Sequence, residues 1–425
     1  MRGPERQQAI YLGGVSGRRP RIPTDAEALE ARAKETMTEE AFAYVAGGAG
    51  TGRTVRANRD GFDAWRIVPR MLRDVGERDS SVELLGRRHT SPFVLSPVGV
   101  LEMAHDEADL AVARAAAAAG VPMTLSNQAS RPMEDCAREL GDGSRYFQLY
   151  WSTSNELVAS FVGRAQACGC EAIVVTLDTT ILGWRTRDLD LAYLPFLRGK
   201  GIAQYTSDPV FDRIITEAAS AEGDGVTAAV PQPKPSPAAL RTLVDLTRAY
   251  PDRFDRALTS GKARAAVQTF VRIYSRPTLT WEDLGFLREH TTLPIVLKGI
   301  LHPDDARRAV EEGIDGIWIS NHGGRQVDGA TSTIAALPGI AEAVAGRLPI
   351  VMDSGIRSGA DAFKALALGA TAVGIGRPFA YALAIAGEDG VRELLDNLQS
   401  DFDLTMGLAG CRSVTEITAE ALVRA

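Results

Sequence analysis

Cysteine and histidine are scarce in this sequence, and long apolar runs are absent. Four cysteines and five histidines in 425 residues offer no metal motif, because the pair in Cys168-Gly169-Cys170 has no second pair near it. We therefore predict reduced thiols and no bound metal. No run reaches the roughly eighteen apolar residues of a membrane span, and residues 1–21 hold no apolar stretch of signal-peptide length. We expect a cytoplasmic protein without a membrane partner.

Positive charge is also in short supply. The 47 lysines and arginines are outnumbered by 54 acidic residues, and the resulting net charge of -7 argues against a nucleic-acid partner. The hydrophobic share of 45% and the charged share of 24% are ordinary for a soluble globular enzyme. The length exceeds one small domain and suits one large α/β barrel with insertions.

What the sequence does contain is a series of short β-rich runs, most of them followed by a helical pattern. The runs are almost continuously apolar, as expected of strands that are covered on both faces. Alternation of strand and helix predicts a parallel sheet, and eight such units predict a closed (β/α)8 TIM barrel. The runs cover residues 93–96, 121–126, 146–150, 172–178, 294–298, 316–320, 349–353 and 372–376.

Two regions fall outside the repeating pattern. Residues 1–24 are predicted to be an N-terminal tail, and a helical N-terminal segment, including residues 25–46, is expected before the barrel. We assign residues 25–425 to a single barrel domain. Residues 182–280, after the fourth strand, are too many for a plain βα loop and are predicted to form a lid. Within the lid, the four prolines of residues 231–237 predict a surface segment.

Each β-rich run ends in a polar or otherwise special residue. In a barrel, the carboxyl ends of the strands converge on one mouth, where the active sites of this fold lie. Eight such ends in register are hard to explain by chance, so we take them as candidate site residues. They are Ser96, Ser126, Gln148 and Tyr150, Thr176 and Asp178, Lys298, Ser320 and His322, Asp353, and Gly376 with Arg377.

The most informative of these ends reads SNHGGRQ, residues 320–326. His322 can take up a proton near neutral pH, and Arg325 can bind a carboxylate with two parallel hydrogen bonds. The glycines between them allow the backbone to approach a ligand closely. A proton acceptor beside a carboxylate clamp suits chemistry on a hydroxy acid. The alternative is a polar loop after a buried strand.

Two further loops predict a phosphate site. Residues 353–359 (DSGIRSG) follow the seventh strand, and Gly376 and Arg377 follow the eighth. These loops commonly cradle a phosphate in this fold, and Arg357 with Arg377 supplies positive charge. The alternative is a pair of structural turns. Lys298, at the end of the fifth strand, either pairs with a neighbouring carboxylate or stabilises negative charge on a flavin ring.

These motifs resemble those of the FMN-dependent L-2-hydroxy-acid oxidase family. The similarity extends over roughly residues 25–415 and is carried by YVAGG (44–48), QLY (148–150), LKGI (297–300) and SNHGGRQ. FMN is the cofactor that the resemblance implies, and FAD is disfavoured because no dinucleotide fingerprint follows a first strand. Within the family, the chain is most similar to the lactate 2-monooxygenases, on the basis of Gly99 and of lid residues 182–199 and 205–211.

The resemblance also implies roles for the site residues. His322 would remove the hydroxyl proton of the substrate while the Cα hydrogen passes as hydride to flavin N5, and Asp178 would stabilise the imidazolium. Tyr44, Arg185 and Arg325 would hold the substrate carboxylate, and Tyr150 would contact the substrate oxygen. The residues implied in FMN binding are Pro97, Val98, Gly99, Ser126, Gln148, Thr176, Lys298, Ser320, Asp353, Ser354, Gly355, Arg357, Gly376 and Arg377.

Three outcomes of the reaction stay open. The resemblance favours oxidation of a short L-2-hydroxy acid, L-lactate first, with O2 as acceptor and decarboxylation to acetate, CO2 and water. The alternatives are an oxidase that releases the 2-oxo acid and H2O2, and a dehydrogenase that uses a quinone or protein acceptor. Gln128 departs from the family, which has tryptophan or an apolar residue there. It either favours a substrate with an extra hydrogen-bonding group or turns toward the lid or solvent. A homo-oligomer, tetramer or octamer, is expected.

Overall fold

The computed structural model describes residues 3–221 and 236–425, and at its centre eight parallel strands close into a barrel. Each strand matches one of the eight β-rich runs, which confirms the predicted (β/α)8 TIM barrel. Neighbouring strands pair in the order β10-β11-β4-β5-β6-β7-β8-β9. Their bounds are β4 (Phe93–Leu95), β5 (Met123–Leu125), β6 (Arg145–Leu149), β7 (Ile173–Thr176), β8 (Ile295–Ile300), β9 (Gly316–Ile319), β10 (Ile350–Met352) and β11 (Ala372–Ile375).

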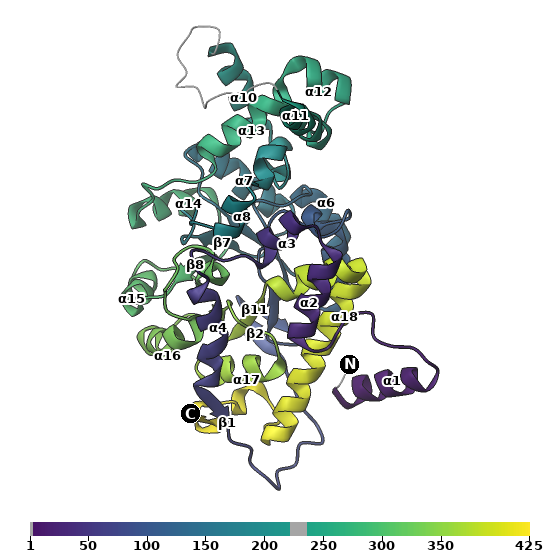
Figure 1. Ribbon diagram of the computed structural model, residues 1–425. Helices are drawn as coiled ribbons and strands as arrows, with labels where there is room; N and C mark the ends of the chain where they lie inside the picture. Colours follow the sequence, from purple (N-terminus) through teal and green to yellow (C-terminus); the bar gives the residue numbers. More distant parts are fainter. Residues whose placement is uncertain (1–2, 222–235) are drawn as a thin grey trace.

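The helices between the strands surround the barrel (Figure 1). Local signals set their ends: the Ser154 and Ser358 hydroxyls accept hydrogen bonds from the amides of Leu157 and Asp361. Gly120 ends the first outer helix in the left-handed conformation. The outer helices are α5 (Asp109–Ala119), α6 (Met133–Leu140), α7 (Asn155–Ala167), α14 (Leu284–His290), α15 (Pro303–Glu311), α16 (Thr333–Val344), α17 (Gly359–Ala367) and α18 (Arg377–Ala409), the last kinked at Ala386 and Gly387.

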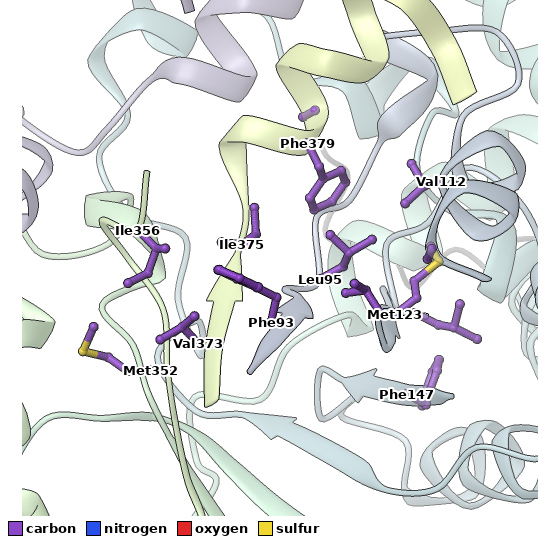
Figure 2. Close-up of a cluster of buried hydrophobic side chains, with 14 of the residues drawn as sticks. Phe93, Leu95, Val112, Met123, Phe147, Met352, Ile356, Val373, Ile375 and Phe379 are labelled. Carbon is purple, nitrogen blue, oxygen red and sulfur yellow. The ribbon is translucent and has the colours of Figure 1, made fainter. Parts of the chain in front are cut away.

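Two apolar layers result from the alternation of side chains along each strand. One set points outward and packs against helices, as Figure 2 shows for Phe93 and Leu95 of β4 beside Phe379 of α18. The other set points into the barrel and fills it. The inward set comprises Val94, Tyr146, Ala172, Val174, Val296, Trp318, Val351 and Ala372, together with Leu84 from outside the barrel.

The inward positions explain why the predicted polar residues meet. Two residues beyond the last inward apolar residue of each of these strands, toward the carboxyl end, the same face of the strand carries a polar or small side chain. These side chains form the next layer inside the barrel, and most are buried. The layer consists of Ser96, Gln148, Thr176, Lys298, Ser320, Asp353 and Gly374.

The N-terminal region differs from the prediction in two places. The helix expected over residues 25–46 is broken at Met37 and Thr38, because the Thr38 hydroxyl caps a second helix by accepting from the amide of Ala41. Residues predicted as a tail contain a helix whose Gly3 amide donates to Asp403 of α18. The region is built from α1 (Gly3–Val15), α2 (Ala26–Thr36), α3 (Glu39–Ala46), α4 (Arg53–Asp63), β1 (Trp65–Ile67), β2 (Val82–Leu84) and β3 (Arg87–His89).

The insertion after β7 is helical. It packs through aromatic contacts such as Phe196 with Phe270, whose ring centroids lie 5.1 Å apart. Residues 231–235 of the proline-rich stretch lie outside the described residues, and Ser236 caps the helix that follows. The insertion contains α8 (Thr186–Asp190), η2 (Pro195–Arg198), α9 (Ala203–Thr206), α10 (Pro209–Ala221), α11 (Pro237–Ala249), α12 (Phe254–Ser260) and α13 (Lys262–Ile273).

Short elements complete the chain. Among the described residues, no helix is both long enough and apolar enough to cross a membrane. The remaining elements are η1 (Leu101–Met103), η4 (Trp281–Asp283), η5 (His322–Gly324), η6 (Val414–Glu416), η7 (Ala419–Ala421) and β12 (Leu422–Arg424), of which β12 pairs with β1.

Candidate active site

A cavity opens at the carboxyl ends of the barrel strands. Four of the predicted residues do not line the cavity but contact residues that do. Asp178 contacts His322, and Gln148 contacts Ser126. Ser320 contacts Lys298, and Thr176 pairs in register with Lys298 in the neighbouring strand. The other predicted site residues line the cavity. They are Tyr44, Pro97, Val98, Gly99, Ser126, Tyr150, Arg185, Lys298, His322, Arg325, Asp353, Ser354, Gly355, Arg357, Gly376 and Arg377.

His322 begins the short turn η5, directly after β9. Its Nδ1 lies 2.8 Å from Asp178 Oδ1 and 3.1 Å from Thr179 Oγ1. A hydrogen bond from Nδ1–H to the carboxylate leaves the lone pair on Nε2 free. Burial lowers the pKa of His322, although Asp178 acts in the opposite direction. The imidazole is therefore neutral near pH 7 and able to accept a proton.

Asp178 is ionised beside this neutral imidazole. Burial alone would raise the pKa of Asp178, but the positive charge that His322 carries once it is protonated and the hydrogen bond from His322, helped by Lys298, outweigh burial and lower it. Its second oxygen, Oδ2, is buried without a hydrogen-bond partner among the described residues. A carboxylate in this state favours protonation of the neighbouring imidazole, because the charged pair is more stable than either ion alone.

Arg185 and Arg325 reach the cavity from the lid and from the loop after β9. The guanidinium of Arg325 lies 4.9 Å from the ring centre of Tyr44 and donates to the carbonyl oxygens of Tyr44 and Gly47. Neither arginine forms an ion pair with a carboxylate in the described part of the chain. Burial, followed by the charge of Arg185, lowers the pKa of Arg325 to about 9. A bound carboxylate would relieve this unfavourable arrangement.

A second pair of partly buried arginines lines the same cavity, and Arg377 lies close to the first pair because it shares the carbonyl oxygen of Gly47 with Arg325. Arg377, at the start of α18, donates to the backbone carbonyls of Val45, Gly47 and Gly323. Burial and the charge of Arg377 lower the pKa of Arg357 to about 10. Gly355 has a φ of 131°, and a side chain there would run into the carbonyl oxygen of Asn58. Two cations and a glycine-bearing loop fit a phosphate.

Lys298 forms the ion pair that was one of the two alternatives considered for it. Its Nζ lies 3.2 Å from Asp353 Oδ2 and donates to Ser320 Oγ at 2.8 Å, so the ion pair exists. The same side chain lines the cavity, although it is only 3% exposed. A buried ammonium held in this way lies where it can stabilise negative charge that develops in the cavity.

Several buried polar atoms fit the polar edge of a flavin ring. Gln148 Nε2 and Thr176 Oγ1 are buried without a hydrogen-bond partner among the described residues. Because unpaired buried polar groups are costly, such atoms point to a ligand that pairs with them. Ser126 Oγ lies 3.4 Å from Gln148 Oε1, so these groups gather at one place. Together with the phosphate loops, they match the two polar ends of FMN.

The structure adds residues that motif reasoning missed. Thr179, Leu182, Phe196 and Tyr274 also line the cavity. All three of Leu182, Phe196 and Tyr274 come from the predicted lid; Leu182 and Phe196 lie in the lid residues 182–199 that carry the resemblance, but nothing in that motif assigns them to the cavity. Only the position of Thr179 beside Asp178 could have singled it out.

Gln128 lines the cavity as well and is 8% exposed, so it does not turn into solvent. The side-chain amide of Gln128 forms no hydrogen bond with the described residues. Its backbone carbonyl oxygen accepts a hydrogen bond from the backbone amide of Val100. Within the described residues, no group of three or more histidine, cysteine, aspartate or glutamate side chains is arranged to hold a metal ion.

Comparisons with known proteins agree with this geometry. The model of the FMN-dependent dehydrogenase family matches residues 33–424. An FMN-dependent alpha-hydroxy acid dehydrogenase of Penicillium citrinum is 40% identical, over 98% of this chain and 95% of its own. An L-lactate oxidase of Lysinibacillus sphaericus is 38% identical, over 98% and 96%. A crystal structure of mandelate oxidase with (S)-4-hydroxymandelic acid superposes with a TM-score of 0.76 at 38% identity, covering 94% of this chain and 98% of that one. The chain therefore belongs to the FMN-dependent dehydrogenase family and is an FMN-dependent alpha-hydroxy acid oxidoreductase.

Proposed function

We propose that the protein oxidises a short L-2-hydroxy acid, L-lactate first, with O2 as electron acceptor. The observation that carries the proposal is the arrangement around one cavity. The neutral His322, paired with Asp178, shares that cavity with the unpaired guanidinium groups of Arg185 and Arg325. A base and a carboxylate clamp are the two features that a 2-hydroxy acid requires.

The proposed substrate site holds the acid by its carboxylate. Arg185 and Arg325 bind the two carboxylate oxygens, and the Tyr44 hydroxyl donates a further hydrogen bond. Burial raises the pKa of Tyr150, so its phenol stays protonated and can donate to the substrate oxygen. This arrangement directs the 2-hydroxyl of the substrate toward Nε2 of His322. The lid residues Leu182 and Phe196 line the cavity, and the buried Phe196 helps to exclude water from it.

His322 then acts as the general base. Its Nε2 takes the hydroxyl proton of the substrate, and Asp178 stabilises the resulting imidazolium. FMN, when bound, accepts the hydride from the substrate Cα. Ser126, Gln148, Thr176 and Lys298 would hold the ring, with the backbone of residues 97–99. Ser320 and Asp353 hold Lys298, and the loops with Ser354, Gly355, Arg357, Gly376 and Arg377 would hold the phosphate.

The more specific proposal is that the 2-oxo acid stays in the closed cavity with the H2O2 formed from O2. Pyruvate and H2O2 then react to give acetate, CO2 and water. The overall reaction converts lactate and O2 into acetate, CO2 and water. The close contact between Gly99 and Gln128, beneath the lid, supports slow product escape. Acetate, CO2 and H2O2 measured together from L-lactate under air test the proposal. Pyruvate and H2O2 as the main products would contradict it.

A second candidate is an oxidase that releases the 2-oxo acid and H2O2. The related L-lactate oxidase and a 4-hydroxymandelate oxidase of Amycolatopsis orientalis, 39% identical over 91% of this chain and 94% of its own, favour it. The same assay separates the two, and a panel of L-2-hydroxy acids identifies the side chain accepted beside Gln128. A dehydrogenase with a quinone or protein acceptor would turn over without consuming O2. The cytoplasmic location and the tetramer or octamer stay predictions.

A further inference from the structure

Two consecutive amides in the loop that carries His322 are held by serine hydroxyls from two different strands. The amide of His322 donates to Ser320 Oγ at 3.0 Å, and the amide of Gly323 donates to Ser354 Oγ at 3.0 Å. His322 and Gly323 have φ angles of 55° and 64°. A histidine rarely adopts this left-handed conformation, so contacts from outside the loop must maintain it.

A buried ion pair connects the two serines. Lys298 Nζ donates to Ser320 Oγ at 2.8 Å and lies 3.2 Å from Asp353 Oδ2. The hydroxyl of Ser354 donates to Asp353 Oδ1 at 2.8 Å. The contacts therefore form a continuous chain that starts at the amide of His322 and ends at the amide of Gly323, the residue that follows the base. Because Lys298 and Asp353 are 3% and 6% exposed, water competes little for these bonds.

Ser354 stands out among these residues, because its backbone conformation does not account for a serine at this position. Its φ is 69°, a conformation that glycine adopts freely and serine does not. Its one hydroxyl hydrogen is committed to Asp353, so the hydroxyl cannot donate to a phosphate. The side chain instead serves the neighbouring loop. This differs from the role in FMN binding that the sequence assigned to Ser354, which its backbone can still fill.

We infer that Ser354 is a positioning residue for the base: its hydroxyl fixes the Gly323 amide and, through Asp353 and Lys298, the backbone of His322. The inference rests on the proposed role of His322. Loss of the Ser354 hydroxyl leaves the amide of Gly323 without its hydrogen-bond acceptor. The loop that carries His322 is then no longer held in one conformation. A displacement of about 1 Å at a catalytic group is enough to slow turnover roughly 100-fold.

The test uses two variants of the FMN-loaded enzyme. Ser354→Gly removes both the hydroxyl and the backbone strain, whereas Ser354→Ala removes the hydroxyl and keeps the strain. We expect both to lose roughly 10- to 100-fold in kcat, with KM and the FMN dissociation constant changed less than about threefold. In thermal unfolding of the FMN-free protein, Ser354→Gly should be the more stable of the two. Ala345→Gly, at the left-handed end of α16 and exposed, is the matched control and should leave kcat unchanged.

A double variant separates positioning from other roles. Added to His322→Gln, Ser354→Gly should slow turnover no further, because the serine acts through the histidine. A turnover loss that adds to that of His322→Gln would overturn the inference. So would a raised FMN dissociation constant with normal kcat at saturating FMN, which would make Ser354 a cofactor ligand. If His322→Gln itself leaves turnover intact, the proposed function fails, independently of Ser354.

Discussion

The two ends of the barrel are built from the same strands, yet they are filled in opposite ways. At the amino end, Leu84 from the β2–β3 hairpin closes an interior of apolar side chains such as Val174 and Trp318. One layer further along the strands, the interior turns polar, with the ion pair between Lys298 and Asp353 at its centre. The first end needs no ligand to fill its interior, although the indole N–H of Trp318 is buried without a hydrogen-bond partner among the described residues. The second leaves polar atoms unpaired until a ligand arrives.

The difference indicates where stability and function are located. Apolar burial at the closed end stabilises the barrel without any partner. At the mouth, the left-handed Ser354 and the guanidinium groups of Arg325 and Arg357, which form no ion pair among the described residues, reduce stability and prepare the site for two anions. Substitutions at the mouth should therefore change turnover more than stability, and those at the closed end should do the reverse.

The largest effect is expected at the mouth. His322→Gln keeps the size and polarity of the side chain but removes the base, so turnover should fall by roughly 10² to 10⁴. The FMN content, read from the visible absorbance of the purified protein, should match the wild type, because the ring and phosphate contacts come from other strands. Near-normal turnover would require a different base. A colourless wild-type protein that takes up no FMN would contradict the whole assignment.

At the closed end, Leu84→Ala should do the reverse. The side chain is 1% exposed among the inward apolar residues, so its truncation should cost about 2–5 kcal/mol in unfolding free energy. Denaturant unfolding measures this loss, and kcat for the folded fraction should stay near wild type. Leu408→Ala, at a leucine that is 73% exposed, is the matched control and should change stability by less than about 0.5 kcal/mol. A large fall in kcat for Leu84→Ala would mean that the two ends are coupled.

A smaller effect, on the products, is expected at Gly99. A Cβ added there would lie 2.9 Å from the carbonyl oxygen and 3.0 Å from the Cβ of Gln128, so the loop after β5 must shift. Gly99→Ala should therefore loosen the closed cavity and increase H2O2 relative to acetate from L-lactate, with substrate oxidation itself less affected. Gly163→Ala on α7, where the added methyl group meets nothing, should leave the ratio unchanged. An unchanged ratio in both variants would remove Gly99 from product retention.

Much of this architecture could be predicted from the sequence, because it depends on local patterns. Near-continuous apolar runs marked the eight strands, and the polar residue at each end marked the mouth. The lid residues Phe196 and Tyr274 could not be predicted to face the cavity, since contacts across the insertion bring them there. The sequence predicts Ser354 as a residue of the phosphate loop, because nothing in the sequence indicates that Gly323 approaches its hydroxyl. Local signals predict which residues gather, and tertiary contacts decide which atoms they bind.

A comparison of two buried carboxylates, Asp178 beside the mouth and Asp109 away from it, provides the test with the smallest expected effect. Asp178 is stabilised in its ionised form by His322, whereas Asp109, at the start of α5, accepts a hydrogen bond from the amide of Ser130 and forms no ion pair among the described residues. Burial raises the pKa of Asp109 from 3.8 to about 7, with Glu102 adding to the shift. Its ionisation is thus unfavourable in the folded protein.

The sign of the pH dependence follows from this shift. Between about pH 4 and 7 the folded state retains a proton on Asp109 that the unfolded state has released, so the contribution of Asp109 to stability falls as pH rises and is constant above about 7. Asp109→Asn removes the titrating group and keeps an oxygen for the Ser130 amide. The variant should gain stability relative to wild type at pH 8.5 and much less at pH 5, as measured by urea unfolding. Asp63→Asn, at a side chain that is 79% exposed, should show no such difference. An equal change at both pH values would place the pKa of Asp109 near its ordinary value and remove the contrast with Asp178.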